Sequence, residues 1–462
     1  MNCSQKSCER KNAGSKRKQK VNRIQKQRGK NIVFQLFQTI NHFFPNLFQD
    51  MRELEDCRKK SDYELAELIM AGIAMSLFMK GSRNAFNNVA EEGEFKKNYK
   101  KIFKMRIPHM DTVDNVMRRL KQDQLERLKH SMIHVLINKK TLHKHKFMKR
   151  WFVVAVDATG IMSFEEKHCD QCLHTTSESG KTTYFHNVLE AKLVTPNGFS
   201  ISLITEWVEN PGKEYDKQDC ELKAFKRLAV KLKGLYPKLP VCITADGLYP
   251  NQGVFSICRK NKWAFIITLK DGNLPTFWEE VGELRKITVN NAYTEKLIEG
   301  KKTILRDYCW INGIDYKGHS LNWIECCESV TDANGKQKNK RFVHVTDIKI
   351  DRAIAGKTSQ TGRLRWKIEN EGFNIQKNHG YALKHKYSRV SYLAAKNYYQ
   401  CLQMGHIINQ LLILSNNFQE HMTGKTTIKH LWILLIGFLI YCHVDAGELS
   451  TQSERKIQIR FR

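Results

Sequence analysis

Two apolar, β-branched runs that each end in an aspartate constrain this 462-residue chain more than any other feature. The first is WFVVAVDATG, residues 151–160, and the second is VCITADG, residues 241–247. Runs of this kind, bounded by turn residues, are typical of buried strands. They place Asp157 and Asp246 at the carboxyl ends of strands, where α/β sheets bind ligands. The chain is therefore expected to contain an α/β domain with acids at one edge of its sheet.

The patterns around these runs extend the predicted domain over residues 149–282. Residues 184–194 and 199–206 have the composition of strands, and a Pro-Asn-Gly turn joins them. With the first run they form a predicted antiparallel meander. Residues 219–233 carry apolar side chains at helical spacing, and residues 264–269 (AFIITL) form another short apolar run. Strands and helices that alternate in this way predict an α/β fold.

The chain before this domain is predicted to be helical, over residues 31–148. The four residues from Ser61 match a helix capping box, and residues 112–136 carry apolar side chains in helical phase. Arg118 and Arg119 lie outside that apolar stripe. This pattern suits a helical DNA-binding domain, with the two arginines as candidate DNA contacts. It suits a plain helical bundle equally well.

Positive charge dominates the composition. The formal net charge is +30, and residues 1–30 hold eleven Lys or Arg against the single acid Glu9. Such an excess predicts a polyanionic partner, which we expect to be DNA. Residues 1–30 are predicted to be a basic flexible arm that adds phosphate contacts, and a solubilising tail explains the same composition.

Hydropathy gives no indication of a membrane protein. The longest apolar run, residues 431–442, is shorter than the roughly 20 residues that a spanning helix needs. Residues 1–30 lack the apolar segment of a secretory signal. The thirteen cysteines are therefore expected to be reduced thiols in a cytoplasmic protein.

Residues 283–350 change character again. Short alternating segments separated by polar turns predict a β-rich insertion. Trp310 and Trp323 lie in it and are expected in its core. Residues 351–416 return to helical patterns that complete the α/β domain, and residues 417–462 are predicted to be a C-terminal helical segment.

The segment RWKIENEGFNIQK, residues 365–377, is predicted to be a helix with an acid on its buried side. At about 100° per residue, Glu369 falls between two apolar flanks, whereas Glu371 falls on the opposite side with Lys367. A buried carboxylate is costly unless it is paired or binds a metal. An i, i+4 ion pair with Arg365 explains Glu369 if the segment is taken alone. A metal site explains it if other acids converge on it.

Asp157, Asp246 and Glu369 together form a set of two strand aspartates and one helix glutamate. Three carboxylates converge only if a cation neutralises them, and Mg²⁺ takes oxygen ligands of this kind. Two such ions activate a nucleophilic oxygen and stabilise the leaving oxygen at a phosphorus atom. We therefore expect the three acids to hold Mg²⁺ or Mn²⁺ and to be catalytic.

The same residues resemble the acidic triad of DDE transposases from bacterial insertion sequences, in the group with a Y-x2-R-x3-E-x6-K signature. The resemblance covers roughly residues 105–415 and rests on the order of the acids, their strand–strand–helix context and the late β insertion. It implies an RNase H-like domain with a β-rich insertion, preceded by a helical DNA-binding domain. It also implies metal-dependent DNA cleavage and strand transfer at element ends by a dimer on DNA, in a bacterial, nucleoid-associated enzyme.

The match to the signature is partial. Arg365 and Glu369 keep the Arg-to-Glu spacing, but Gly362 stands at the Tyr position. Gln376 stands at the Lys position, and the nearest lysine is one residue later. The candidate DNA contacts of this half of the chain are Arg365, Lys377 and Lys270.

A second group of potential metal ligands, of the His and Cys types, follows Asp157 closely in the sequence. His168, Cys169, Cys172 and His174 have the residue types and the close spacing of a zinc site. Such a site is expected to be structural, since the acids account for chemistry at phosphorus. A polar loop with reduced thiols is the alternative.

Two other functions remain compatible with these residues. An RNase H-like nuclease without strand transfer needs the same three acids. A catalytically inactive or domesticated DNA-binding protein explains the incomplete signature, although the three acids are intact. Convergence of the acids in space is the observation that separates an enzyme from a binding protein.

Overall fold

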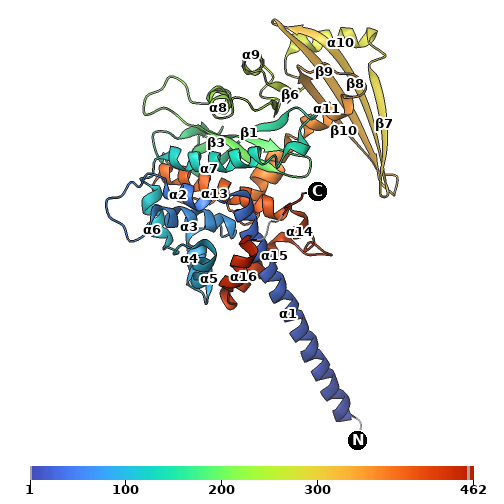
Figure 1. The fold of residues 1–462 in the computed structure, drawn as a ribbon. Coiled ribbons are helices and arrows are strands. Elements are labelled where there is room, and N and C mark those ends of the chain that lie inside the picture. The colour runs from blue at the N-terminus through green and yellow to red at the C-terminus, as the bar shows by residue number, and fades with distance from the viewer. Residues whose placement is uncertain (1–2, 455–457, 462) are drawn as a thin grey trace. The chain divides into compact units, whose positions relative to one another are not determined.

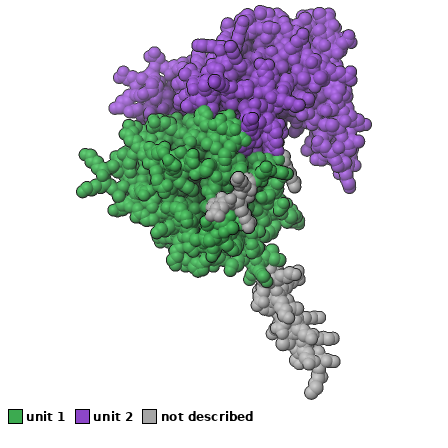
Figure 2. All heavy atoms as spheres, in the orientation of Figure 1, with its two compact units in different colours: residues 1–139, 375–462 green, residues 140–374 purple. Residues whose placement is uncertain are grey.

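The computed structural model describes the backbone of residues 3–454 and 458–461, and the side chains of residues 22–452 and 458–461. The chain divides into two compact units (Figure 2). Unit 1 combines residues 1–139 with residues 375–462, and unit 2 is residues 140–374. The fold is mixed α/β, with helices in unit 1 and a large sheet with helices in unit 2.

Unit 1 is built from helices of both ends of the chain (Figure 1). The N-terminal helices are α1 (Cys3–Phe43), α2 (Leu47–Arg52), α3 (Leu65–Leu77), α4 (Arg83–Glu91), α5 (Phe95–Phe103), α6 (Met110–Met117) and α7 (Gln122–Asn138). The C-terminal helices are α12 (Ile375–Asn378), α13 (Tyr392–Ile413), α14 (Asn416–Gln419), α15 (Ile428–Tyr441) and α16 (Ala446–Glu454). The two sets pack together, with α13 against α3 and α15 against α1.

This division differs from the domains expected from the sequence. The expected flexible arm, residues 1–30, is helical from Cys3 onward as part of α1. Residues 417–462 share a unit with the N-terminal helices instead of forming a separate segment. The physical reason is that α15 is strongly apolar and needs a partner surface, which α1 and α5 provide. Within the described part of the chain, no helix combines the length and the hydropathy that a membrane span requires.

Helices α3 and α13 pack against each other at positions that carry small residues. All 13 residues of α3 are buried, and α13 is buried over most of its length. A Cβ atom added to Gly405 would lie 2.9 Å from Cβ of Ser76, and one added to Gly72 would lie 3.1 Å from Sγ of Cys401. The two glycines therefore let the helix backbones approach closely.

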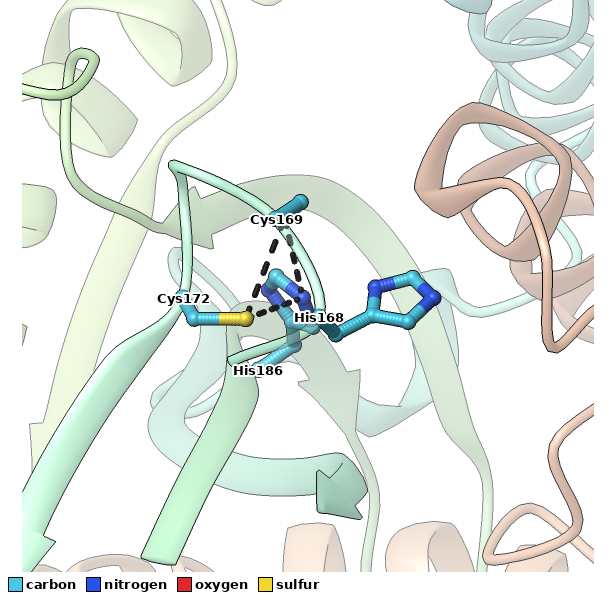
Figure 3. Close-up of side chains that lie close together, drawn as sticks. All are labelled: His168, Cys169, Cys172 and His186. Atoms are coloured by element: carbon cyan, nitrogen blue, oxygen red, sulfur yellow. Dashed lines mark hydrogen bonds between the residues drawn. The ribbon is translucent and has the colours of Figure 1, made fainter. Parts of the chain in front are cut away.

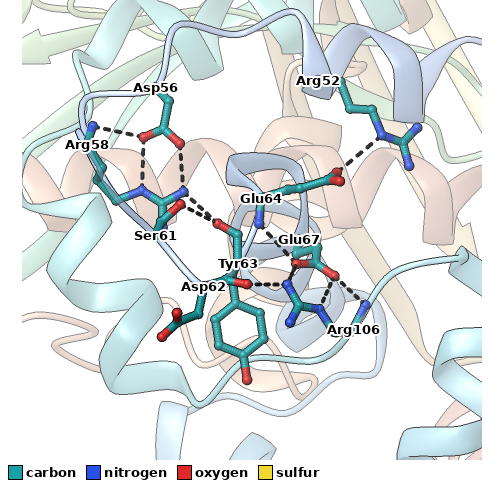
Figure 4. Close-up of polar contacts among 9 residues, drawn as sticks. All are labelled: Arg52, Asp56, Arg58, Ser61, Asp62, Tyr63, Glu64, Glu67 and Arg106. Carbon is teal, nitrogen blue, oxygen red and sulfur yellow. Dashed lines mark hydrogen bonds and ion pairs between the residues drawn. The ribbon is translucent and has the colours of Figure 1, made fainter.

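The start of α3 differs from the predicted capping box at Ser61 (Figure 4). The helix begins at Leu65, and the N–H of Glu64 donates to Oε2 of Glu67 at 3.0 Å. Arg106 donates to the same carboxylate from its backbone N–H and its guanidinium, at 2.8 and 2.9 Å. The box is therefore Glu64-x-x-Glu67, one turn later than predicted, because Arg106 neutralises the buried Glu67.

The single helix predicted over residues 112–136 is two helices, α6 and α7, separated at residues 118–121. The side-chain amide of Asn397 donates to the carbonyl oxygens of Met117 and Leu120, each at 2.9 Å. These bonds satisfy backbone acceptors at the end of α6 that a continuous helix would have paired internally. A residue that is distant in sequence thus stabilises the break.

Unit 2 is built on one sheet (Figure 1). Its strands are β1 (Phe152–Phe164), β2 (Leu173–Thr176), β3 (Thr182–Val194), β4 (Ser200–Val208), β5 (Val241–Ala245), β6 (Ala264–Thr268), β7 (Ala292–Glu299), β8 (Lys302–Tyr316), β9 (His319–Thr331) and β10 (Gln337–Thr346). Its helices are the 3₁₀-helix η1 (His143–His145), α8 (Glu221–Leu235), α9 (Gln252–Asn261), α10 (Pro275–Ile287), α11 (Ala355–Arg363) and the π-helix η2 (Ile368–Asn374). The five strands predicted before residue 270 are all present.

The strands follow the order β2–β3–β1–β5–β6–β10–β9–β8–β7, with β4 paired to β3. β1, β3 and β4 form the predicted antiparallel meander. β5 adds parallel to β1, and β6 adds parallel to β5. The predicted β-rich insertion is present as β7–β10, and it continues the main sheet because β10 pairs antiparallel with β6. Trp310 and Trp323 are buried on β8 and β9, which confirms their expected place in the core.

Helices α11 and η2 lie against one face of this sheet. The buried side chains between them include Val153, Ala155, Cys242, Ile266, Ile368 and Phe373. Gly362 of α11 lies so near the sheet that an added Cβ would be 2.5 Å from the ring of His344. A tyrosine at this position would overlap the sheet, so the side chain that the signature has here does not fit this packing.

Candidate active site

The register of the sheet places Asp157 beside Asp246. Val156 of β1 pairs with Ala245 of the parallel strand β5, so the two aspartates follow on neighbouring strands and on the same face. Asp246 follows the end of β5 as predicted, whereas β1 continues to Phe164. Asp157 therefore lies in the middle of its strand, level with the point where β5 ends.

Glu369 reaches the same site from η2. Nη1 of Arg365 lies 2.6 Å from Oε1 of Glu369 and 3.7 Å from Oδ2 of Asp157. The two carboxylates therefore face each other across one guanidinium nitrogen. Arg365 thus contacts two of the three predicted acids, Glu369 and Asp157.

The burial of the helix differs from the prediction. The side chain of Glu369 is 49% exposed, whereas that of Glu371 is 26% exposed and ion-paired along the helix. The predicted α-helix is a π-helix at this point, and its wider turn brings Ile368 and Phe373, five residues apart, onto the sheet together. Glu369 thus borders an open site instead of a buried face. π-helical turns of this kind occur frequently at functional sites.

Negative charge accumulates around Asp157. Burial and the charge of Glu369 raise the pKa of Asp157 to about 7, although the guanidinium of Arg365 opposes this shift. Glu221 adds a smaller increase. Carboxylate oxygens from two strands and a helix are the donors that a hard divalent cation prefers, and its charge would offset their repulsion.

Two further residues of the site carried no distinguishing signal in the sequence. Glu221 is the first residue of α8, where an acid is the ordinary complement of the helix dipole. Burial and the charge of Asp246 raise its pKa. Tyr249 is fully buried, and its hydroxyl donates to Oε2 of Glu221 at 3.4 Å. Burial and the charges of Glu221, Asp157 and Asp246 raise the pKa of Tyr249, so a fourth carboxylate borders the same site.

Lys270 lies at the edge of this acidic set. Its Nζ is 3.7 Å from Oδ2 of Asp246, and its stem crosses Gly247, where an added Cβ would be 2.6 Å from Cδ of the lysine. A cleft of about 490 Å³ adjoins it. The wall of the cleft carries five basic side chains, the acid Asp271 and a tryptophan; these are Lys270, Asp271, Lys340, Arg341, Arg363, Arg365 and Trp366. Basic side chains beside a partly exposed tryptophan suit a nucleic-acid strand.

The other predicted DNA contacts belong to unit 1. Arg118 lines a cleft of about 700 Å³ there, and its guanidinium also donates to Asp114 at 2.5 and 2.9 Å. Arg119 is exposed, and Lys377 is half-buried in α12. The basic residues of the cleft wall are Arg83, His109, Arg118, His385, Lys386 and Arg389. Burial and the charges of Arg389 and Arg83 lower the pKa of His385, so this cleft concentrates positive charge.

Gln376, at the Lys position of the signature, is a core residue of unit 1. It is fully buried, and its side-chain amide contacts Gln403 and His406, each at 2.9 Å. A lysine here would place an ammonium group in this buried polar network. The departure from the signature is therefore explained by packing within unit 1.

Three of the four predicted zinc ligands lie close together, and a fourth residue that was not predicted joins them (Figure 3). His168, Cys169 and Cys172 lie close to His186 of β3, whereas His174 lies on β2 outside the group. The prediction of His174 is therefore wrong. His186 is brought in by strand pairing, which no local spacing in the sequence indicated.

Comparison of the chain with protein-family models and with curated proteins gave no match.

Proposed function

We propose that this chain is a DDE-type DNA transposase in which Asp157, Asp246 and Glu369 hold Mg²⁺ or Mn²⁺. The observation that carries the proposal is that Asp157 and Asp246 follow paired residues on neighbouring strands, while Arg365 contacts both Asp157 and Glu369. The order β4–β3–β1–β5–β6, a meander followed by two parallel strands, supports an RNase H-like domain.

The chemistry proposed is the cleavage and joining of phosphodiesters at the ends of a mobile element. In the first step, water attacks a phosphodiester at the element end and the bond to the 3′-oxygen breaks, which releases a 3′-OH. In the second step, this 3′-OH attacks a phosphodiester of the target and displaces the 3′-oxygen of the target strand. Divalent cations bound by the acids supply charge stabilisation at phosphorus and activate the attacking oxygen. The two aspartates are held by adjacent strands, and Glu369 is accessible from solvent. With a cation bound by the acids, Arg365 would be released from its contacts with Asp157 and Glu369 and would be able to donate to a phosphate oxygen.

The distribution of positive charge supports DNA as the substrate. The chain carries a net charge of +30, and each unit has a cleft with basic walls. In unit 2 the cleft shares Lys270 and Arg365 with the acidic set. Binding that depends on phosphate contacts of this kind is expected to weaken steeply with salt. We propose that the enzyme acts as a dimer on DNA. We also propose that it acts in the bacterial cytoplasm.

The proposal is tested by nicking of supercoiled plasmid by the full chain. We expect nicking with Mn²⁺ or Mg²⁺ and none with EDTA. Asp157→Asn and Asp246→Asn should each lower the rate at least about a hundredfold, since each removes a metal ligand while keeping the side-chain volume. Binding of plasmid that persists without any nicking under all metal conditions would instead support the inactive DNA-binding protein.

A second measurement separates a transposase from a nuclease that uses the same acids. Duplexes that carry the sequences flanking the coding region are incubated with a target plasmid and Mg²⁺. Covalently joined duplex–plasmid products, absent with Asp157→Asn, are expected for a transposase. Cleavage without joined products supports the nuclease.

A further inference from the structure

The loop between β1 and β2 brings a group of soft metal ligands against β3 (Figure 3). One ligand atom from each of His168, Cys169, Cys172 and His186 lies within 4.8 Å of the other three. The two Sγ atoms are 3.8 Å apart, and Nε2 of His186 lies 3.5 Å from one and 3.3 Å from the other. Cys172 and His186 are buried, and the other two residues are half-buried.

These separations match the edges of a zinc tetrahedron. Zn–S bonds of about 2.3 Å and Zn–N bonds of about 2.0–2.1 Å place two sulfurs about 3.8 Å apart, and a sulfur and a nitrogen about 3.5 Å apart. The Sγ–Sγ distance of 3.8 Å also exceeds the roughly 2.05 Å of a disulfide by a wide margin. An ion therefore fits between Cys169, Cys172 and His186 with almost no movement of the ligand atoms.

His168 completes the set from the outer side. Its ring stacks on Phe164, with centroids 4.4 Å apart and planes inclined by 8°. In Figure 3 this ring extends to one side of the other three ligands. Because its ligand atom lies within 4.8 Å of theirs, we expect rotation of the side chain away from Phe164 to bring it to a shared ion.

We propose that His168, Cys169, Cys172 and His186 bind one Zn²⁺ as a structural site of unit 2. Two thiolates and two imidazoles form a donor set of closed tetrahedral zinc sites, whereas Mg²⁺ and Ca²⁺ prefer oxygen. Four protein ligands leave no open position for substrate, so the ion has a structural role. This proposal does not depend on the proposed transposase activity.

The ion joins the loop to the strand pair that carries the candidate active site. His186 pairs with Met162 in the ladder between β3 and β1, and Asp157 lies on the same strand β1. Asn210, at the end of β4, also holds the loop, because its amide donates to the carbonyl oxygen of Cys172 at 2.7 Å. Zinc binding is therefore expected to stabilise the meander against unfolding.

The test measures the metal content of the full chain, purified without chelators, by mass spectrometry. We expect about one zinc per chain, and a Co²⁺-substituted protein with the absorption bands of tetrahedral thiolate coordination. Cys172→Ser and His186→Asn should lose both signals. His174→Asn is the matched control, because this histidine lies on β2, two residues after Cys172 and outside the group, and it should keep both signals.

Three results would overturn the proposal. One is a parent chain that binds no zinc when Zn²⁺ is supplied in excess. Another is full zinc content in both Cys172→Ser and His186→Asn. The third is loss of zinc in His174→Asn. If Cys172→Ser is insoluble, release of zinc from the parent on mercurial titration of its thiols provides the same test. Asp157→Asn should retain its zinc, so this outcome is separate from that of the nicking assay.

Discussion

Arg365 donates to Glu369 at 2.6 Å and lies 3.7 Å from Asp157, so one guanidinium nitrogen occupies the space between two carboxylates of the candidate active site. A divalent cation bound by the same acids must displace this contact. Under the proposed function, Arg365 would compete with the metal in the free protein and would become available to a phosphate once the metal was bound.

Replacement of Arg365 should separate metal binding from catalysis. Arg365→Gln is expected to tighten Mn²⁺ binding several-fold, because the competing cation is gone, while plasmid nicking falls at least about tenfold. Mn²⁺ affinity is measured by calorimetry and nicking on supercoiled plasmid. The control is Lys367→Gln, since Lys367 pairs with Glu371 on the same segment and does not contact the acidic set. A parallel loss of metal affinity and nicking in Arg365→Gln would contradict the competition.

Glu369 and Glu371 form a matched pair of acids two residues apart. Glu369→Gln should abolish metal-dependent nicking, with a loss of at least about a hundredfold, because it removes one of the proposed metal ligands. Glu371→Gln should retain nicking, since its partner is Lys367 at 2.5 Å. Equal loss in both variants would show that disruption of the helix, and not the missing ligand, is responsible.

The basic cleft of unit 1 should contribute to DNA affinity through phosphate contacts. Lys386 and Arg389 line it. The double variant Lys386→Ala/Arg389→Ala is expected to bind duplex DNA more weakly, and to lower the slope of log affinity against log salt concentration by about 2. Fluorescence anisotropy at several salt concentrations measures both quantities. Lys59→Ala/Lys60→Ala, which removes two exposed lysines outside the cleft, is the control. An unchanged slope in the cleft variant would exclude this surface from the contact.

His344 should make the folded state sensitive to acid. Burial, with the charges of Arg363 and Arg365, lowers its pKa to about 4, whereas an unfolded histidine has a pKa of about 6.5. Below about pH 6.5 the unfolded chain takes up a proton that the folded chain does not bind until about pH 4. The stability linked to His344 is thus complete above pH 6.5 and is lost as the pH falls toward 4.

The variant His344→Gln tests this linkage, because glutamine does not titrate. Between about pH 7 and about pH 4.5, its free energy of unfolding should decrease by about 2–3 kcal/mol less than that of the parent. Urea unfolding at the two pH values supplies the comparison. His379→Gln, at an exposed histidine, controls for loss of a histidine elsewhere. If parent and His344→Gln lose the same stability on acidification, the linkage is absent.

Elements with strong local patterns were predictable from the sequence. The runs that became β1, β3, β4, β5 and β6 were recognised from β-branched composition, and α8 from its apolar spacing. Two aspartates near the ends of such runs were enough to predict a shared site. In parallel neighbours, corresponding positions lie side by side, and the pairing of Val156 with Ala245 brings Asp157 next to Asp246.

The remaining features of the fold and of the candidate site depend on contacts between residues that are distant in sequence. The sequence by itself determined the class of elements and the three acids, because short-range spacing and composition encode them. Only the tertiary structure decided that η2 is a π-helix with Glu369 exposed, that Glu221 joins the acids, and that β10 extends the main sheet. The tertiary structure also showed that His186, and not His174, lies with the other candidate zinc ligands. The physical reason is that strand pairing and core packing act between segments whose separation along the chain leaves no periodic signal in either of them.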